Sequence, residues 1–273
     1  MIGFIYLFSA MIHPHIADGA KTVPMRHYLN KGALLSYDPI GKKLQHDGID
    51  FHLLTGSTDA ISRIPIASIG EHPEGREIIC LDPYNAPKLM SKYQELLSLL
   101  KDQACTSFRE TLTVIADFIK YRVFESDKCH QLNLERFINQ WMIAHSDRPQ
   151  AFTYAKDGRK IPVIPLDAFV EEGIGMCRHV SLATAFFLDN ILKDPDLKHI
   201  LPSGTVYHVR DQLFEGGHSW NIYISEDRSQ FWHIDSFWEL IANLNLIDEK
   251  ESLYLEYGKS CIKTEIRRFF KDG

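Results

Sequence analysis

Apolar residues recur at helical spacing through the middle of the chain. Residues three or four positions apart lie on one face of a helix. Between residues 86 and 123, two stripes have this spacing: Leu89, Tyr93, Leu96 and Leu100, then Phe108, Leu112, Ile115, Ile119 and Val123. They predict two amphipathic helices whose apolar faces belong to a hydrophobic core. A third helix is expected over residues 132–144.

Extended segments and loops are expected on either side of this helical region. Residues 13–85 are interrupted by Pro and Gly and contain extended runs at 33–37 and 49–54, which predicts short strands joined by loops. Residues 146–165 are polar and rich in Pro. This composition predicts a linker, or a loop that lines a cleft.

Cys177 lies at the start of a further predicted helix. The run after it lacks Gly and Pro and has one stripe at helical intervals: Val180, Ala183, Thr184, Phe187 and Ile191. This predicts a helix with one buried stripe. Because Gly173 and Gly175 come just before, Cys177 is expected at the helix N-terminus. Unpaired amides and the positive end of the helix dipole favour a thiolate there and could receive an oxyanion.

A hairpin is predicted downstream of this helix. His218 begins a run of alternating hydrophobicity that continues to residue 225, and residues 230–236 form a second run. The polar residues 226–229 between them read as a turn, and residues 205–211 form a plausible third strand.

The register of this hairpin brings His218 near Asp235. If Glu226 pairs with Ser229 across the turn, Trp220 lies opposite Asp235, and His218 is a diagonal neighbour of Asp235 on one face. Diagonal neighbours have backbones about 7–8 Å apart, a distance that His and Asp side chains can bridge.

The order and context of Cys177, His218 and Asp235 predict a thiol nucleophile, its base and the carboxylate that orients the base. His179, His208 and His233 are competing bases, but at two positions beyond Cys177 a helical His179 points away from the thiol. The alternative of a metal site formed by Cys177, His179, His218 or Asp235 is disfavoured. Side chains two apart on a helix diverge by about 200°, and no CxxC pair supports a site.

Three sequence blocks in this region resemble the transglutaminase-like superfamily. They are Gly-Met-Cys-Arg-His around Cys177, Gly-His-Ser-Trp-Asn around His218 and Trp-His-Ile-Asp ending at Asp235. The residues Cys-Arg-His followed by His-Ser-Trp-Asn are particularly similar to those of the transglutaminase-like domain of plant Raf-like kinases, and more loosely to those of bacterial protein-deamidase toxins. The resemblance covers roughly residues 160–245.

The resemblance implies an α+β fold with a papain-like core, in which the helix that bears Cys177 packs on an antiparallel sheet. It also implies Cys177 as nucleophile, His218 as base and Asp235 as orienter. Gln140 and Trp141 are candidates for completing the oxyanion hole only because glutamine or tryptophan does so in relatives, and they read equally well as a pair on a helix surface.

The implied reaction is acyl transfer at an amide bond of a protein or peptide substrate. Water resolving a glutamine thioester gives deamidation, and a lysine gives crosslinking. The same triad acting on a backbone amide is a cysteine protease, and a further alternative is an inactive domain that only binds. None of these reactions needs a cofactor or a metal.

The residue pattern divides the chain into a strand and loop region (1–85), a helical region (86–145) and a transglutaminase-like core (146–273). The three regions could form one continuous domain. The 273 residues are 45% apolar with a net charge of −6. Scattered Lys and Arg give no nucleic-acid footprint. Trp220, Trp232 and Trp238 could wall a substrate channel, although strand aromatics are more often core.

Localisation is predicted from the cysteines and the N-terminus. Five cysteines without a framework spacing predict free thiols in a reducing compartment, so the protein is expected in the cytoplasm or as an effector delivered into a host cell. Residues 1–12 are apolar but shorter than the roughly 20 residues of a membrane span, and they lack a positive n-region. A buried strand or docked segment is expected there, with a weak secretion signal as the alternative. His13 and His15 are read as exposed loop residues rather than a metal pair. The sequence indicates no oligomeric state.

Overall fold

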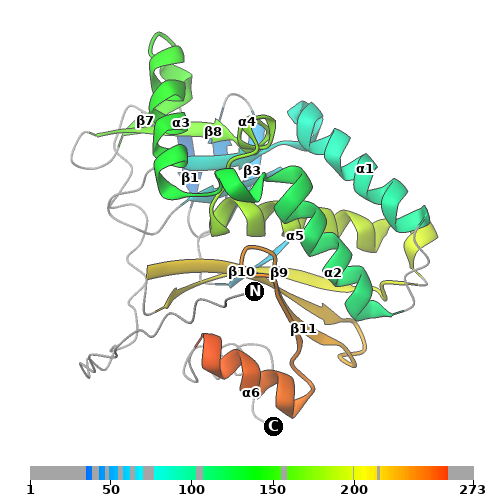
Figure 1. The fold of residues 1–273 in the computed structure, drawn as a ribbon. Helices are drawn as coiled ribbons and strands as arrows, with labels where there is room; N and C mark the ends of the chain where they lie inside the picture. Colours follow the sequence, from blue (N-terminus) through cyan, green and yellow to red (C-terminus); the bar gives the residue numbers. More distant parts are fainter. Residues whose placement is uncertain are drawn as a thin grey trace, which may run out of the picture.

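The computed structural model describes residues 35–38, 43–46, 49–54, 58–61, 65–69, 77–102, 107–154, 159–198, 200–213 and 216–257. Within these residues the fold is α+β, with helices packed against two sheets (Figure 1). The predictions for the apolar N-terminus, His13 and His15 lie outside the described residues.

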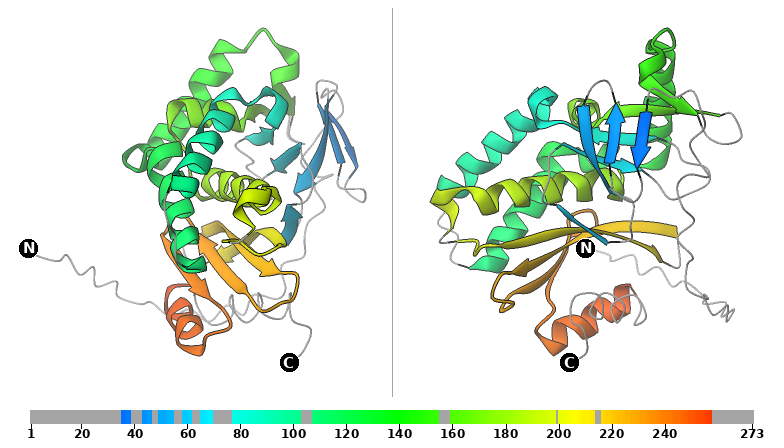
Figure 2. Two further views of the ribbon diagram at one scale, coloured as in Figure 1. Left: turned by 90° about the vertical axis from the view of Figure 1, so that its right-hand side faces the viewer. Right: turned by 180° about the vertical axis from the view of Figure 1, so that it is seen from behind.

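Among the described residues, the first sheet has seven strands, and it lies at the back of Figure 1 and at the front of Figure 2, right. Its pairings are antiparallel except for β3 with β5 and β6 with β8. In spatial order the strands are β1 (Leu35–Asp38), β2 (Lys43–His46), β3 (Ile49–Leu54), β5 (Ile66–Ile69), β6 (Ile78–Leu81), β8 (Lys160–Pro165) and β7 (Phe152–Tyr154).

The second sheet has five strands in the described part of the chain, and all of their pairings are antiparallel. In spatial order they are β12 (Leu240–Asn243), β11 (Phe231–Asp235), β10 (Gly216–Ser225), β9 (Gly204–Leu213) and β4 (Thr58–Ile61). Because β4 pairs with β9, and β6 pairs with β8 in the first sheet, the region before residue 85 contributes strands beside those of the C-terminal region.

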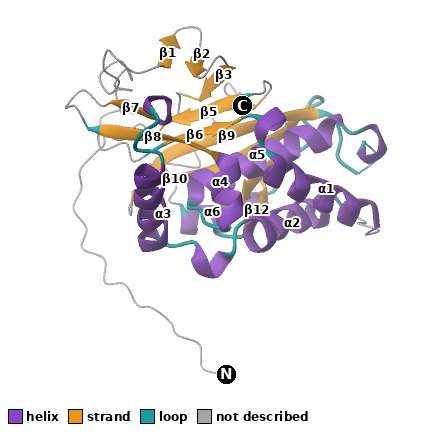
Figure 3. Cartoon of the chain, turned by 90° about the horizontal axis from the view of Figure 1, so that it is seen from above, coloured by secondary structure: helices purple, strands orange, loops and turns teal. Residues whose placement is uncertain are grey.

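Apart from the last helix, the helices lie to one side of the first sheet when the molecule is seen from above (Figure 3). The longer ones are α1 (Pro87–Asp102), α2 (Phe108–Phe118), which continues into a π-helical turn η3 (Ile119–Val123), and α3 (Gln131–Ala144). Single 3₁₀ turns are η2 (Pro83–Asn85), η4 (Ser126–Lys128), η5 (Pro149–Ala151) and η6 (Pro195–Leu197). The predicted stripe of α1 is confirmed, since Leu89, Tyr93, Leu96 and Leu100 are all buried.

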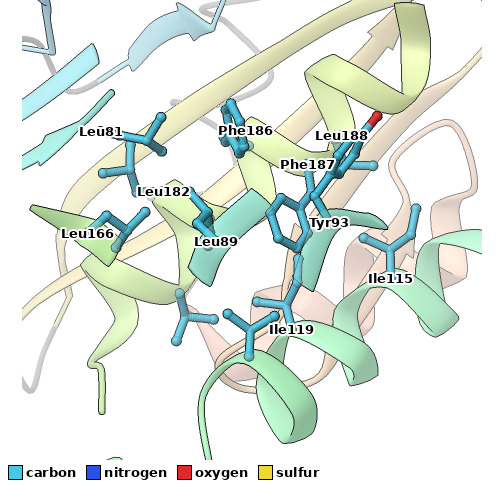
Figure 4. Packing of buried hydrophobic residues seen from close by; sticks show 14 of the residues in the cluster. Leu81, Leu89, Tyr93, Ile115, Ile119, Leu166, Leu182, Phe186, Phe187 and Leu188 are labelled. Carbon is cyan, nitrogen blue, oxygen red and sulfur yellow. The ribbon is translucent and has the colours of Figure 1, made fainter. Parts of the chain in front are cut away.

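The helix α5 (Cys177–Lys193) lies at the centre of the fold, and the prediction of a single buried stripe on it is wrong. Leu182, Phe186 and Leu188 are buried as well as the predicted stripe, because α5 is covered on several sides. It packs on β9 and β10 of the second sheet and also contacts α2 and the short helix α4 (Leu166–Glu172). Its side chains belong to one core with residues of α1, α2 and the first sheet, part of which Figure 4 shows.

Residues 146–165 are not a linker, contrary to the prediction from their polar and Pro-rich composition. They include β7 and β8, and β8 is an interior strand of the first sheet. Its core contribution comes from Ile161, Val163 and Ile164, which are buried. The prolines hid this strand, because Pro lacks the N–H that an interior strand normally donates.

The approach to α5 is shaped by two glycines. Gly173 ends the short helix α4 (Leu166–Glu172) in the left-handed region, with φ of 69°, a conformation that glycine adopts without strain. At Gly175, a Cβ would come within 2.8 Å of the Phe124 ring. The chain therefore passes Phe124 closely just before Cys177.

The last helix, α6 (Ile247–Glu256), covers the second sheet on the side opposite α5 (Figure 1). Leu253 and Tyr257 enter a second, smaller core with Trp220, Ile222 and Phe231. Among the described residues, no helix is long and apolar enough to cross a membrane.

Candidate active site

Cys177 is the first residue of α5, as the sequence predicts. The first amides to donate to Met176 O are those of His179 and Val180, at 2.9 and 3.1 Å. The N–H groups of Cys177 and Arg178 precede these bonds and have no acceptor within the helix. Cys177 is half-buried, so its thiol lies at a helix N-terminus near the protein surface.

His218 and Asp235 lie on the neighbouring strands β10 and β11 and form the expected pair. The register confirms the predicted hairpin, because Asn221 pairs with Ile234 and Ile222 with His233. Nε2 of His218 lies 2.5 Å from Oδ2 of Asp235. Both side chains are buried, so little water screens this contact.

The side chain of Asp235 is held by four donors. Its Oδ1 accepts the backbone N–H groups of Phe237 and Trp238, at 2.9 and 3.0 Å. Its Oδ2 accepts from His218 and from the hydroxyl of Tyr257. Burial opposes the charge on this carboxylate, but these hydrogen bonds hold its pKa below the usual range. Asp235 is therefore ionised at neutral pH.

His218 also interacts with Cys177. Burial opposes a charged imidazole, but the hydrogen bonds to Asp235 and to the Cys177 side chain outweigh it and raise the pKa of His218 to about 9. Because Nε2 faces Asp235, Nδ1 is the ring atom left for the thiol. The three predicted residues are thus brought together in the order thiol, imidazole, carboxylate.

Aromatic rings enclose the imidazole. The ring of Trp238 stacks on that of His218, with centroids 3.9 Å apart and planes 15° apart. Trp238 is 38% exposed, so it lies between His218 and solvent. Trp220 and Trp232 do not line a channel together, since they are buried in the two separate cores.

The start of α5 is anchored through the two residues that follow Cys177. Nε of Arg178 lies 2.5 Å from Oε1 of Glu77, a buried carboxylate just before β6. Nε2 of His179 lies 3.4 Å from the same oxygen, and Nδ1 of His179 accepts the N–H of Met176. Burial opposes the charge on Glu77, but Arg178 and His179 lower its pKa to about 2.

The competing histidines have other partners. His179 points away from the thiol, as predicted, and packs on the ring of Phe169. Its burial lowers its pKa to about 4, so it is neutral at pH 7. His208 Nε2 lies 3.0 Å from the hydroxyl of Ser181, and His233 Nε2 lies 3.1 Å from the hydroxyl of Tyr257.

The candidates for an oxyanion side chain lie on α3. Gln140 is exposed, and Trp141 stacks on His145 with ring centroids 3.8 Å apart and packs on Phe137. These contacts fit their reading as helix residues. Sequence reasoning missed Glu77 and Tyr257. Glu77 directly precedes β6 and Tyr257 directly follows α6, and no sequence motif marks either position.

A pocket of about 540 Å³ lies between α1 and α2 and is lined by Leu99, Val114 and Phe118 with Glu95, Asp102 and Asp117. None of its lining residues belongs to the triad. In the described part of the chain, no cluster of His, Cys, Asp and Glu could hold a metal ion. Comparisons of the chain with protein-family models, curated proteins and solved structures give no match.

Proposed function

We propose that the protein is a cysteine-dependent acyl-transfer enzyme of the transglutaminase-like type, acting on amide bonds of proteins. One observation carries this proposal: a half-buried thiol at a helix N-terminus contacts an imidazole whose other nitrogen is held by a buried carboxylate. This is the arrangement of nucleophile, base and orienting group that acyl transfer requires. The papain-like reading of the fold belongs to the same proposal.

In the first half of the reaction, the Cys177 thiolate attacks the amide carbonyl carbon and a C–S bond forms. The N–H groups of Cys177 and Arg178 are donors for the oxyanion, because they lack helical acceptors. His218 then donates its Nδ1 proton to the amide nitrogen, and the C–N bond breaks. An amine leaves, and a thioester remains on Cys177.

In the second half, neutral His218 removes a proton from water or from a second amine, which attacks the thioester. The C–S bond breaks, and the proton stays on His218 beside the restored thiolate. Asp235 keeps the imidazole in one orientation and offsets its charge throughout. Protons and electrons balance without a cofactor or metal.

The resemblance of the three sequence blocks, and not the chemistry of the triad, favours a glutamine side chain as the acyl donor. Water then gives deamidation and lysine gives crosslinking. A backbone amide would make the same triad a cysteine protease. Ammonia release, amine incorporation and peptide cleavage on a panel of unfolded proteins distinguish these outcomes.

The first test is the pH dependence of iodoacetamide alkylation at each cysteine, read by mass spectrometry. We expect Cys177 to react quickly at pH 6, where an ordinary thiol with a pKa near 8.5 is only roughly 0.3% ionised. Cys80 and Cys129 are internal controls, because burial raises the pKa of Cys80 to about 12 and also raises that of Cys129. Equal, slow reaction of all three would contradict the proposal.

Two variants separate an enzyme from a domain that only binds. Cys177→Ala should abolish turnover while the fold, read by circular dichroism, is kept. His218→Gln should slow alkylation of Cys177 at pH 6 without changing the controls. A folded protein with a reactive Cys177 that releases no product from any protein amide would favour the binding module.

The same proposal places the protein where thiols stay reduced, in the cytoplasm or inside a cell to which it is delivered. Cys80, Cys129 and Cys177 are free thiols, which fits a reducing compartment. Fractionation with an epitope-tagged protein tests this, and recovery of the protein only in an oxidising compartment would contradict it.

A further inference from the structure

Oδ2 of Asp235 is shared between two donors from different elements. One is Nε2 of His218 on β10, and the other is the hydroxyl of Tyr257, which follows α6. Behind Tyr257 lies His233 on β11, with its Nε2 3.1 Å from the same hydroxyl. Tyr257, His233 and Asp235 are each at most 1% exposed, so these bonds are shielded from water.

The direction of each hydrogen bond follows from proton count. A phenol has one proton, and Tyr257 donates it to Asp235. The Tyr257 oxygen can then only accept, so Nε2 of His233 carries the proton that it donates to Tyr257. The result is a continuous line of donors from His233 through Tyr257 to Asp235, which meets His218 at one carboxylate oxygen.

We propose that Tyr257 and His233 are positioning residues that extend the triad and set how strongly Asp235 holds the imidazole. This inference rests on the proposed function. Neither residue is a member of the triad, and each acts through Asp235. The segment that follows α6 therefore helps to position the triad, although α6 lies on the sheet face opposite α5.

The effect follows from competition for one oxygen. A hydroxyl bonded to Oδ2 takes up part of the negative charge that otherwise faces His218. Removing the hydroxyl concentrates this charge on the imidazole, so the protonated form of His218 becomes more favourable. A donor from His233 to the Tyr257 oxygen strengthens the hydroxyl as a donor, so losing His233 acts in the same direction, more weakly.

Other titratable groups face His218 and stay in place in the experiment. Cys177 contacts it from α5, and Asp235 contacts it from β11. Asp211 is its cross-strand partner on β9. Since none of the three is altered by a change at Tyr257, a shift in the titration of His218 reports the hydroxyl.

The deciding experiment is an NMR titration of the ¹⁵N-labelled His218 ring in the full chain, with the alkylation profile of Cys177 measured in parallel. Tyr257→Phe should raise the pKa of His218 by about one unit, the equivalent of one charge-assisted hydrogen bond. Tyr223→Phe is the matched control. Tyr223 is equally buried, but its hydroxyl donates to Pro202 O, so the titration of His218 should not move.

A second pair of variants tests the hydrogen bonds from His233 through Tyr257 to Asp235 without removing the tyrosine. His233→Leu should shift the titration upward by a smaller amount, and His233→Gln, which keeps a side-chain N–H, should restore it. Folded Tyr257→Phe and His233→Leu proteins with unchanged titration would overturn the inference. Loss of the fold in both would assign these residues to stability alone and overturn it as well. Slow alkylation of Cys177 in the unaltered protein would instead count against the proposed function.

Discussion

A neutral amide cannot replace the carboxylate of Asp235 in its hydrogen bonds. Its Oδ1 accepts two backbone N–H groups, so an asparagine would keep its oxygen there and turn its NH₂ toward His218 and Tyr257. A donor would then face Nε2 of His218, and the ring proton would move to Nδ1, on the side of the thiol. The site thus depends on a charged carboxylate as well as on its position.

The first prediction concerns Asp235→Asn. In the proposed reaction, His218 must be protonated to release the amine, so activity of the unaltered protein should fall as pH rises through about 9, the raised pKa of this group. In the variant, the loss of activity on the alkaline side of the pH profile should begin at lower pH. Turnover should fall roughly 10⁴-fold, as expected when the wrong tautomer of His218 is favoured. The measurements are turnover and alkylation against pH. A variant whose alkaline loss of activity still lies near pH 9 would contradict this account.

The second prediction concerns Glu77→Gln. This change leaves Arg178 with a neutral partner in a buried setting and should destabilise the fold by about 3 kcal/mol at pH 7. The folded-state pKa of Glu77 is lowered from 4.5 to about 2, so its contribution is present above pH 4.5 and is lost as pH falls toward 2. Urea-unfolding midpoints at pH 7, 4 and 3 should therefore converge for the two proteins. A gap that stays constant would exclude the ion pair as its cause.

At the scale of elements, α6 docks through one side of its surface. Leu253 is 3% exposed and Leu255 is 87% exposed on the same helix. The ion pair of Arg109 with Glu249 ties the start of α6 to α2. The docking of α6 therefore depends on its buried side, and this docking also places Tyr257 beside Asp235.

The third prediction uses this contrast. Leu253→Ala should destabilise the protein by about 2–5 kcal/mol, the usual result of truncating a buried leucine. Leu255→Ala, its control, should change stability by less than about 0.5 kcal/mol. Denaturant unfolding measures both, and equal effects would mean that α6 does not dock on this side.

Elements with a clear periodicity could be predicted, and others could not. The helices α1, α2 and α3 follow their apolar pattern closely, because each buries one regular face, and β3 coincides with the predicted extended run 49–54. The strand β8 escaped because Pro162 and Pro165 imitate a loop. The extra burial of α5 comes from tertiary neighbours, which its own sequence does not encode.

At the scale of the whole molecule, the chain alternates between the two sheets. After β3 in the first sheet it enters β4 at the edge of the second, and it returns to the first sheet in β5. β4 covers the outer edge of β9, which an isolated C-terminal half would expose.

The fourth prediction follows. A fragment of residues 86–273 lacks the strands from β1 to β6 and should not fold, because β9 and β8 each lose one of their two neighbouring strands and expose an edge. Size-exclusion chromatography and circular dichroism of the fragment should show aggregation or an unfolded chain, in contrast to the full chain. A monomeric fragment with a reactive Cys177 would show that the N-terminal strands are dispensable.

The candidate site could be predicted only where it is local. Cys177 follows from a helix start, and the pairing of His218 with Asp235 follows from the hairpin register. Glu77 is 101 positions from its partner Arg178, and Tyr257 is 22 positions from its partner Asp235. Such contacts depend on the complete topology, which no local pattern contains.

The position of Tyr257 in the chain also has a consequence in time. A ribosome adds Cys177, His218 and Asp235 before it adds the hydroxyl that bonds Asp235. An unfinished chain therefore carries the three residues of the candidate triad without the segment that completes their surroundings. If Tyr257 positions Asp235 as proposed, the triad reaches its final arrangement only after α6 has been made and has folded back onto the sheet.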